Sequence, residues 1–404
     1  MARKRLEDLE ETRLNGARVL VRVDFNVPIE DGKVSDDTRI RATLPTLRYL
    51  STRRARTILV SHLGRPKAKV DPRYTLAPVA DRLRTLIEAP VSFVDDITGE
   101  RARATVDTLQ PGAILLLENV RFLAGEEAND PELCRQLADF SEVYVNDAFG
   151  TAHRAHASTT GVAGVVRERG GVAVAGFLME RELRFLGEAL TDPRRPFVAI
   201  LGGAKISGKI DVIESLLPRV DQLLIGGAMA NTFFRSLGLE TGDSLVEEDR
   251  VEMGKELMRR AGEKLMLPVD CVVANEAKAG ANVTLVERDA VGAGQRILDI
   301  GPRSVNSFAT VIARAATVVW NGPMGLFEIE DFAAGTIGIA RAVAKATELG
   351  AVTIAGGGDT AAALEAAGLA DSLSHVSTGG GASLEFLEGR ILPGVAALDP
   401  RGAR

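Results

Sequence analysis

The sequence predicts an α/β protein with two doubly wound parallel-sheet domains, joined by a helix and a hinge. Short apolar runs of strand length alternate with amphipathic helical patterns along nearly the whole chain, and this alternation is typical of parallel sheets with crossover helices. A chain of 404 residues has room for two or three domains with separate hydrophobic cores. A glycine-rich segment followed by one long helical pattern divides the chain near its middle.

Each half of the chain contributes its own series of strands. The candidates in the first half are Arg18–Val27, Arg56–Ser61, Ala113–Glu118 and Glu142–Asn146. Those in the second half are Phe197–Leu201, Gln222–Gly226, Cys271–Ala274, Thr317–Asn321 and Ala351–Ala355. The amphipathic stretches between them include Leu76–Ala89, Pro131–Phe140, Lys209–Leu217 and Ala361–Ala367. Because strands and helices alternate, we expect parallel pairing in both halves.

The domain boundary is expected where Gly170, Gly171 and Gly176 precede a helix with charges on one face and apolar residues on the other. A helix joining two globular halves fits this pattern, although an ordinary surface helix has the same one. The expected bounds are 1–172 for the N-terminal domain, 173–190 for the joining helix, 191–388 for the C-terminal domain and 389–404 for a final segment.

Composition and cysteine usage favour a soluble intracellular protein. Hydrophobic residues make up 46% of the chain and charged residues 26%, within the usual globular range. Cys134 and Cys271 lie far apart and cannot form a disulfide framework, which favours a reducing cytoplasm. The charged N-terminus does not have the pattern of a signal peptide, and no apolar stretch reaches the length of a membrane helix.

The charge distribution is uneven and indicates where an anion binds. Residues 1–170 hold 26 Lys and Arg against 25 Asp and Glu, whereas the rest hold 23 against 30. Arginines suit a small anionic ligand because the planar guanidinium binds phosphate or carboxylate through two hydrogen bonds. A solvated arginine-rich surface is the alternative. Nucleic acid fits poorly, since the net charge is −6 and aromatic residues are only 4%.

Four segments of the second half share one design, running from an apolar strand through glycines towards a helix. They are PFVAILGGAKISGKI, QLLIGGAMANTFF, VVWNGPMGLFE and VTIAGGGDTAAAL. Such turns expose backbone N–H groups at a helix N-terminus and suit phosphate. In open α/β sheets they lie at the carboxyl ends of the strands, where ligands bind. Four of them in one half favour a nucleotide or phosphate site over glycines used only for turn geometry.

One of these turns resembles a P-loop without being one. Residues 203–209 read GAKISGK, but Ile210 stands where the P-loop pattern needs Ser or Thr to bind Mg²⁺. We therefore reject a P-loop NTPase. Lys205 and Lys209 remain candidate phosphate contacts, because a lysine at a helix N-terminus opposes the helix dipole and needs another reason to be there.

The first half places polar and basic residues directly after its strands. In RVDFNVP, alternation puts Arg22, Asp24 and Asn26 on one face of a strand that should be buried on both. Further groups follow in SDDTRI, SHLGRP, LLLENVRF and NDAFGTAHRAHAST: Arg39, His62, Arg65, Arg121, Asp147, His153, Arg154 and His156. They predict a basic pocket for a phosphorylated acid. A metal site at His153 and His156 fits less well, because no Cys or acidic pair completes the ligand set.

Together these segments resemble the phosphoglycerate kinase family. RVDFNVP, SDDTRI, SHLGRP, LLLENVRF, NDAFGTAHRAHAST, LGGAK, NGPMGLFE, GGGDTAAAL and STGGGASLEFLEG follow one another in the order found in that family and span residues 22–389. The resemblance implies reversible phosphoryl transfer between Mg-ATP and the carboxylate of 3-phosphoglycerate, giving ADP and 1,3-bisphosphoglycerate in glycolysis and gluconeogenesis. It also implies a hinge-bending cytoplasmic monomer without nucleic-acid or membrane partners.

The resemblance also implies site residues at matching positions. Those expected to bind phosphoglycerate are Asp24, Asn26, Arg39, His62, Arg65, Arg121 and Arg154. Those expected to hold the nucleotide are Lys205, Lys209, Gly227, Asn321, Glu328, Gly356, Gly357, Gly358, Asp359 and Thr360, with Glu328 near the ribose and Asp359 at Mg²⁺. Arg39, Lys205, Gly379 and Gly380 are expected to face the transferring phosphoryl group. The final segment is expected to return to the N-terminal domain.

Three positions depart from the family pattern. Gly208 stands where many relatives have Asp, Ala228 where many have Gly, and Ile297 where many have Gly. The first is expected to touch the hinge and the active site, and the other two the adenine slot, so they bear on nucleotide preference rather than on the reaction.

The acceptor chemistry explains why the expected site holds arginines, lysines and glycines. A carboxylate is already ionised at neutral pH, so its phosphorylation needs no general base, and positioning and charge stabilisation dominate. With the substrates in different domains, the domains must close. Two other functions fit the residues: a sugar or phosphate kinase of another α/β family, and a two-domain protein that closes on an anion without forming ADP.

Overall fold

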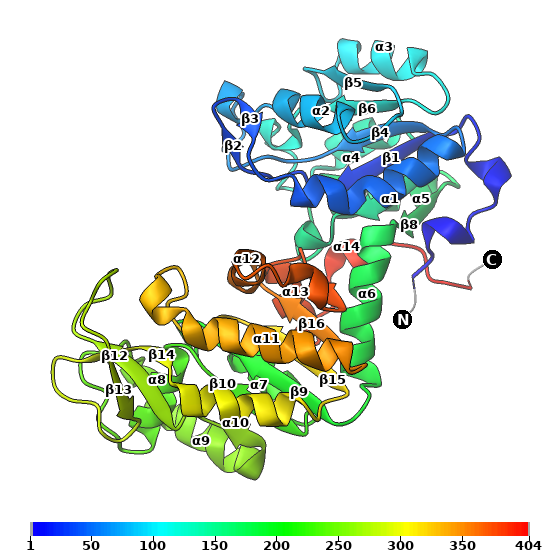
Figure 1. The fold of residues 1–404 in the computed structure, drawn as a ribbon. Helices are drawn as coiled ribbons and strands as arrows, with labels where there is room; N and C mark the ends of the chain where they lie inside the picture. Colours follow the sequence, from blue (N-terminus) through cyan, green and yellow to red (C-terminus); the bar gives the residue numbers. More distant parts are fainter. Residues whose placement is uncertain (1–2, 403–404) are drawn as a thin grey trace. The chain divides into compact units, whose positions relative to one another are not determined.

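The computed structural model describes residues 3–402, and the chain divides into two compact units. The first unit comprises Met1–Arg184 and Ile391–Arg404, and the second comprises Phe185–Arg390. Each contains a six-stranded sheet in which every strand is parallel to its neighbours (Figure 1). The predicted α/β class with two parallel-sheet domains is therefore confirmed.

The first unit has the sheet order β5-β6-β4-β1-β7-β8. Its parallel strands are β1 (Arg18–Val23), β4 (Arg56–Val60), β5 (Val91–Val94), β6 (Ile114–Leu117), β7 (Val143–Asp147) and β8 (Val172–Ala175). A short hairpin consists of β2 (Ile29–Glu30) and β3 (Lys33–Val34). The helices are α1 (Thr38–Thr52), α2 (Ala77–Arg84), α3 (Glu100–Thr108), α4 (Pro131–Ala138), α5 (Val162–Glu168) and α14 (Pro393–Ala396). The strand order reverses beside β1, which is where such sheets form a ligand crevice.

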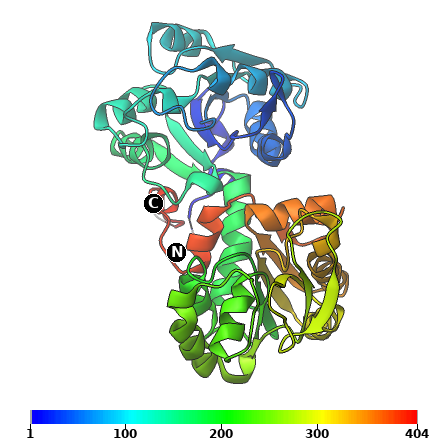
Figure 2. The ribbon, with the colours of Figure 1, turned by 90° about the vertical axis from the view of Figure 1, so that its left-hand side faces the viewer.

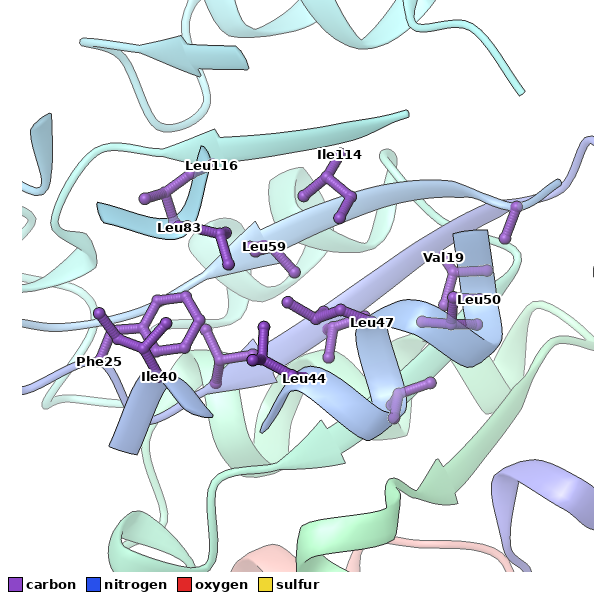
Figure 3. Packing of buried hydrophobic residues seen from close by; sticks show 14 of the residues in the cluster. Val19, Phe25, Ile40, Leu44, Leu47, Leu50, Leu59, Leu83, Ile114 and Leu116 are labelled. Carbon is purple, nitrogen blue, oxygen red and sulfur yellow. The ribbon is translucent and has the colours of Figure 1, made fainter. Parts of the chain in front are cut away.

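The core of the first unit explains why these residues form these elements. Val19 and Val23 of β1 face the same side of the sheet and pack with Leu47 of α1, Leu83 of α2 and Leu116 of β6 (Figure 3). The α1 residues of this cluster recur three or four positions apart, as one face of a helix requires. Every strand of the sheet centre is buried on both sides, so its residues read as continuous apolar runs.

The second unit has the parallel order β11-β10-β9-β15-β16-β17, which reverses beside β9. These strands are β9 (Phe197–Leu201), β10 (Gln222–Ile225), β11 (Leu265–Met266), β15 (Thr317–Asn321), β16 (Val352–Gly356) and β17 (His375–Val376). The helices are α7 (Ile210–Leu216), α8 (Met229–Ser236), α9 (Val251–Ala261), α10 (Pro302–Ile312), α11 (Ala334–Glu348), α12 (Gly358–Ala366) and α13 (Gly381–Leu387). Trp320 of β15 is fully buried among residues of α10 and α11.

One strand prediction needs correction. The run Cys271–Ala274 was expected to join the parallel series, but it belongs to β12 (Asp270–Ala274), the central strand of a separate antiparallel sheet. Its partners are β13 (Thr284–Glu287) and β14 (Arg296–Ile300). The connection from β12 to β13 is too short for a crossover helix, which needs about a dozen residues or more, so these two strands pair antiparallel. The sequence pattern does not indicate this sheet, because β13 is short and exposed.

The ends of the chain and the middle helix complete the description. Helix α6 (Phe177–Thr191) covers most of the range 173–190 expected for a joining helix. The segments around Arg3 and Pro400 form an isolated bridge, and Figure 2 shows them side by side in a second view. Both cysteines, Cys134 and Cys271, are buried free thiols. Within residues 3–402, no helix has the length and apolar character needed to cross a bilayer.

Candidate active-site residues in the two units

In the first unit, the predicted polar residues meet at the carboxyl ends of neighbouring strands. Strand β1 ends at Val23, so Asp24 and Asn26 lie just beyond the sheet edge rather than within the longer strand expected over Arg18–Val27. His62 follows β4, Arg121 lies in a short helical turn after β6, and Arg154 follows β7. Parallel strands end on one edge, so chain segments 130 residues apart in sequence converge beside β1.

Asp24 connects two of the other predicted residues. Its Oδ2 accepts a hydrogen bond of 2.6 Å from Nη1 of Arg39, the second residue of α1. Its Oδ1 lies 4.0 Å from Nδ1 of His62 and, although buried, has no hydrogen-bond partner among residues 3–402. A buried acceptor without a donor is rare in folded proteins. Asp24 therefore offers a free acceptor next to the basic groups.

His62 is buried among arginines. Nη2 of Arg22 lies 3.1 Å from Nδ1 of His62. Burial, and then the positive charges of Arg22, Arg121, Arg39 and Arg154, hold the pKa of His62 well below its ordinary value. The imidazole is therefore neutral at physiological pH, and the positive charge of this region comes from the arginines.

Asn26 and Arg121 hold the turn that carries Arg65. Oδ1 of Asn26 accepts a hydrogen bond of 2.9 Å from the Gly64 N–H, and Nη1 of Arg121 donates one of 2.8 Å to the Gly64 carbonyl. Burial lowers the pKa of Arg121, whose Nε lies 3.3 Å from Oε1 of Glu127. Arg65 itself is exposed and has no hydrogen bond or ion pair with any residue in 3–402. Its guanidinium is thus free to bind a ligand.

Arg154 completes the basic group. It is partly buried, and its Nε lies 3.1 Å from Nε2 of His153. Arg39, Arg121 and Arg154 thus lie near one neutral histidine and one aspartate, and Arg65 extends from the turn that follows His62. This charge balance suits a small molecule with two or three negative charges and a hydroxyl, because guanidinium groups pair with phosphate and carboxylate through charge-assisted hydrogen bonds.

In the second unit, the site is built from backbone turns beside β9. Gly227 follows β10 with φ +65°, and a Cβ atom on it would lie 2.5 Å from the Gly203 nitrogen. Gly322 follows β15 with φ +96°, and a Cβ there would lie 2.3 Å from the Gly202 oxygen. No other residue type fits so close an approach at positive φ. The glycines therefore bring three strand-end turns into contact.

These turns open onto a mostly apolar cavity of about 520 Å³. Its lining includes Gly227, Glu328 and Asp359, which are expected for the nucleotide, and two of the departures from the family pattern, Ala228 and Ile297. Volume and lining suit a flat aromatic group with a polar tail. Lys205, Lys209 and the Gly379–Gly380 pair are not among the lining residues. Gly208, the third departure, is exposed, and a Cβ on it would meet only the Lys205 oxygen at 4.0 Å.

The two lysines differ in environment. Nζ of Lys209 makes a short contact with Oδ1 of Asn321, whose Nδ2 donates a hydrogen bond of 2.8 Å to the Gly356 carbonyl. Burial lowers the pKa of Lys209 to about 8, although the carboxylates of Asp359 and Glu388 act in the opposite direction. Lys205 is exposed and makes no hydrogen bond or ion pair within residues 3–402. Lys209 is thus fixed by the fold, whereas Lys205 is free to reach a ligand.

The run Gly356–Thr360 forms the N-terminus of α12. Gly357 is the N-cap with φ +96°, and the Thr360 hydroxyl accepts a hydrogen bond of 2.7 Å from the Gly322 N–H. The first N–H groups of the helix remain available for an anion. Gly379 and Gly380 precede α13, where the Gly379 N–H donates a hydrogen bond of 3.1 Å to Oγ of Ser377.

The residues present also decide how a magnesium ion can be held. Residues 3–402 contain no group of three or more His, Cys, Asp or Glu side chains that could hold a metal by themselves. Asp359 is exposed in the first turn of α12 and lines the cavity. Mg²⁺ commonly binds through one or two carboxylates together with substrate phosphates and water. Asp359 fits that role only when a nucleotide supplies the remaining ligands.

Sequence reasoning missed one group of buried residues. Glu126 and Ser158 are fully or nearly fully buried and hydrogen-bond to each other, and Ser158 also accepts a hydrogen bond from Arg22, next to His62. Glu126 lies in the polar run GEEAND, which has the composition of a surface loop. Its local sequence contains no signal for burial, because the burial comes from packing against a segment 32 residues later.

Comparison with known proteins identifies the family. A sequence profile of the family described as "Phosphoglycerate kinase" matches residues 9–390. A protein named phosphoglycerate kinase from Chloroflexus aggregans is 56% identical over 98% of this chain and 99% of its own. One of the same name from Chlorobaculum tepidum is 54% identical over 99% of this chain and all of its own.

Solved structures give the same result. The structure of phosphoglycerate kinase from Coxiella burnetii has a TM-score of 0.87 and 42% sequence identity, covering 98% of both chains. That of phosphoglycerate kinase from Pyrococcus horikoshii has a TM-score of 0.83 and 33% identity, again over 98% of both chains. The similarity extends over the full length in sequence and in fold.

Proposed function

The chain belongs to the phosphoglycerate kinase family and transfers a phosphoryl group between ATP and the carboxylate of 3-phosphoglycerate, and from this premise we propose a role for each group of residues. Phosphoglycerate binds the basic residues of the first unit, and the nucleotide binds the cavity and glycine turns of the second. The observation that carries this assignment is that the two units offer different groups to a ligand. The first unit has four arginines after its strands and at the start of α1, whereas the second unit has a mostly apolar cavity partly lined by glycines.

We assign the parts of phosphoglycerate by charge. The phosphate takes Arg65, Arg121 and Arg154, because three guanidinium groups can donate to its three terminal oxygens. The carboxylate takes Arg39, which lies beside Asp24. A carboxylate repels an anion, so the free Oδ1 of Asp24 suits the hydroxyl of the substrate, which can donate to it. Asn26 and His62 complete the set with neutral hydrogen bonds.

The nucleotide assignment follows the cavity. The base lies against Gly227, Ala228 and Ile297, and the exposed carboxylate of Glu328 accepts from the ribose hydroxyls. The phosphates meet the N–H groups of Gly356–Thr360 and the side chains of Lys205 and Lys209, with Asn321 fixing Lys209. Asp359 holds Mg²⁺, which when bound neutralises charge on the nucleotide phosphates.

Transfer then requires little covalent chemistry from the protein. The acceptor carboxylate is already ionised, so the chain's task is to orient it and to stabilise the charge on the moving group. We assign this to Arg39, Lys205 and the N–H groups at Gly379 and Gly380. Because the two substrates bind different units, the reaction needs the units to approach and exclude water. We also propose a monomer in the cytoplasm, a reducing compartment that suits the free thiols.

Two experiments test these assignments. Mg-ATP and 3-phosphoglycerate should yield an acyl phosphate that hydroxylamine traps, and no trapped product would contradict carboxylate as acceptor. Calorimetric titration of Asp359→Asn should show weaker Mg-nucleotide binding with phosphoglycerate binding intact, since the two sites are in separate units. Equal loss of both ligands would contradict the division of substrates between the units.

A further inference from the structure

A hydrogen-bond network of buried polar side chains connects Glu126 through Ser158 and Arg22 to His62. We propose that Glu126 is a positioning residue that acts through Ser158 and Arg22 to keep the proton of His62 on Nε2. His62 then presents a neutral hydrogen-bond donor to phosphoglycerate. This inference rests on the proposed function in one respect, namely that His62 belongs to the phosphoglycerate site.

The first link is between Glu126 and Ser158. Oε2 of Glu126 accepts a hydrogen bond of 2.9 Å from the Ser158 N–H, and Oε1 accepts one of 2.6 Å from its hydroxyl. The Glu126 carbonyl also accepts a hydrogen bond of 2.9 Å from the Ala157 N–H, at the start of the π-helical segment Ala157–Gly161. Glu126 has no exposed surface. Both oxygens of a fully buried carboxylate are thus committed to one serine.

The second link, between Ser158 and Arg22, fixes which groups donate and which accept along this hydrogen-bond network. A serine hydroxyl has one proton, and an ionised carboxylate only accepts, so the Ser158 proton points to Glu126. The Ser158 oxygen is then free to accept from Nε of Arg22 at 2.8 Å. Arg22 is 1% exposed, and a buried guanidinium group needs a nearby anion to compensate for the loss of its hydration. Glu126 therefore supplies the compensating charge for Arg22 through one hydroxyl.

The third link sets the tautomer of His62. A guanidinium group only donates and stays protonated, so Nδ1 of His62, 3.1 Å from Nη2 of Arg22, must be the unprotonated nitrogen. The burial and the surrounding arginines that lower the pKa of His62 keep the ring neutral. Its single proton is then on Nε2, which has no hydrogen-bond partner among residues 3–402. The Nε2 N–H of His62 is therefore a free hydrogen-bond donor within the proposed anion site.

The other charged groups around this hydrogen-bond network do not change the tautomer that we assign to His62. Oδ1 of Asp24 lies 4.0 Å from Nδ1 of His62, beyond hydrogen-bond range, so Arg22 rather than Asp24 decides the tautomer. Nδ1 of His156 lies 3.9 Å from Oε1 of Glu126, also too far for a hydrogen bond. Arg39, Arg121 and Arg154 add positive potential at His62, and Glu127 pairs with Arg121. The arginines favour the neutral form of His62, and burial acts in the same direction.

The test uses nitrogen NMR of the imidazole rings in the full-length enzyme. The sequence has four histidines, so His62 can be assigned by the signal lost in His62→Gln. Without substrate at neutral pH, His62 should be neutral with its proton on Nε2. Ser158→Ala removes the acceptor for Arg22 and should give a mixture of tautomers. A wild-type His62 that is doubly protonated, or protonated on Nδ1, overturns the proposal.

Steady-state kinetics provide the second test of the proposed role of Glu126. Ser158→Ala should raise the KM for phosphoglycerate about five- to tenfold, the usual effect of one lost buried hydrogen bond, and leave the KM for ATP unchanged. Glu126→Gln keeps the shape but removes the charge and should have the larger effect. The control is Ser51→Ala, which removes a hydroxyl that donates a hydrogen bond of 2.8 Å to the Gly112 carbonyl, outside the proposed site.

The outcomes separate this proposal from the proposed function. If Ser158→Ala lowers stability as Ser51→Ala does, but changes neither the tautomer nor the KM for phosphoglycerate, Glu126 is only structural and the proposal is wrong. If Glu126→Gln does not fold, Ser158→Ala alone decides. If His62→Gln leaves the KM for phosphoglycerate unchanged, the site assignment of His62 fails, whereas the NMR result still reports on the tautomer.

Discussion

The two units present different chemistry to the two anions that the reaction brings together. In the first unit the candidate ligand groups are side chains: arginines, Asp24 and His62 from loops at the strand ends and from the first turn of α1. In the second unit they are mainly backbone N–H groups at glycine turns beside a mostly apolar cavity of about 520 Å³. Both sets lie where the strand order reverses, beside β1 and beside β9.

This difference follows from the ligands that we assign. Phosphoglycerate is small and almost entirely polar, so charge-assisted hydrogen bonds must supply its binding energy. A nucleotide has a large flat base that an apolar cavity can bind, and its phosphates can use helix N-termini. As assigned, the first site depends on individual side chains, whereas the second depends on the backbone. Single substitutions should therefore act differently in the two units.

The largest effect is expected at the free lysine of the second unit. Lys205→Ala should lower kcat by about 10²–10³-fold, because Lys205 is assigned to charge that develops on the transferring group. Steady-state kinetics with both substrates measure this effect. The control is Lys255→Ala, which removes an exposed lysine paired with Glu252 on α9 and should change nothing. A higher KM with unchanged kcat would make Lys205 a ground-state contact.

The next effect tests the side chains of the first unit. Arg65→Ala should raise the KM for phosphoglycerate with little change for ATP, since one charge-assisted hydrogen bond contributes about 1.5–3 kcal/mol. Arg121→Ala should cost more, because it also releases the Gly64 carbonyl. Arg135→Ala, at an exposed ion pair on α4, serves as the control. Normal phosphoglycerate affinity in Arg65→Ala would remove Arg65 from the site.

A glycine substitution tests the backbone side of the comparison. Gly227→Ala places a methyl group 2.5 Å from the Gly203 nitrogen at φ +65°, and such strain costs about 1–3 kcal/mol. The KM for ATP should rise, and phosphoglycerate binding should stay normal by calorimetry. Gly164→Ala in α5, where a Cβ meets no atom within 4 Å, is the control. Unchanged nucleotide affinity would mean that the turns tolerate movement and that the backbone argument is wrong.

The smallest effect on activity, but a distinct one on stability, is expected from buried acids. Burial raises the pKa of Asp299 to about 7 in the second unit and that of Asp147 to about 6 in the first. The unfolded value is near 3.9. The folded state therefore binds the proton more tightly, and the stability gained is full below about pH 3.9 and lost as pH rises through the folded pKa.

Asparagine variants should remove this dependence. The stability deficit of Asp299→Asn relative to the parent protein should shrink from about pH 4 to about pH 7, and that of Asp147→Asn should stop shrinking near pH 6. Urea unfolding followed by the fluorescence of Trp320, the single tryptophan, measures the second unit. A deficit for Asp299→Asn that grows with pH would contradict the raised pKa.

Sequence patterns predicted most of the fold because parallel sheets bury their strands on both faces. Continuous apolar runs mark strands such as Phe197–Leu201 and Thr317–Asn321, which match β9 and β15. The exposed strand β13 has no such run, so the antiparallel sheet around β12 was missed. Local patterns do not contain the pairing partner of a strand, which depends on connection length and on contacts made after folding.

By itself, the sequence determined the α/β class through its periodicity and the residue types that carry charge or allow tight turns through its composition, while the family followed from motifs that resemble it. The tertiary structure alone decided which groups meet. It brings Glu126 of a polar loop against Ser158 and the Gly227 turn against Gly203, and it leaves Oδ1 of Asp24 without a donor among residues 3–402. Burial and hydrogen-bond partners arise from segments far apart in the chain, so no local pattern records them.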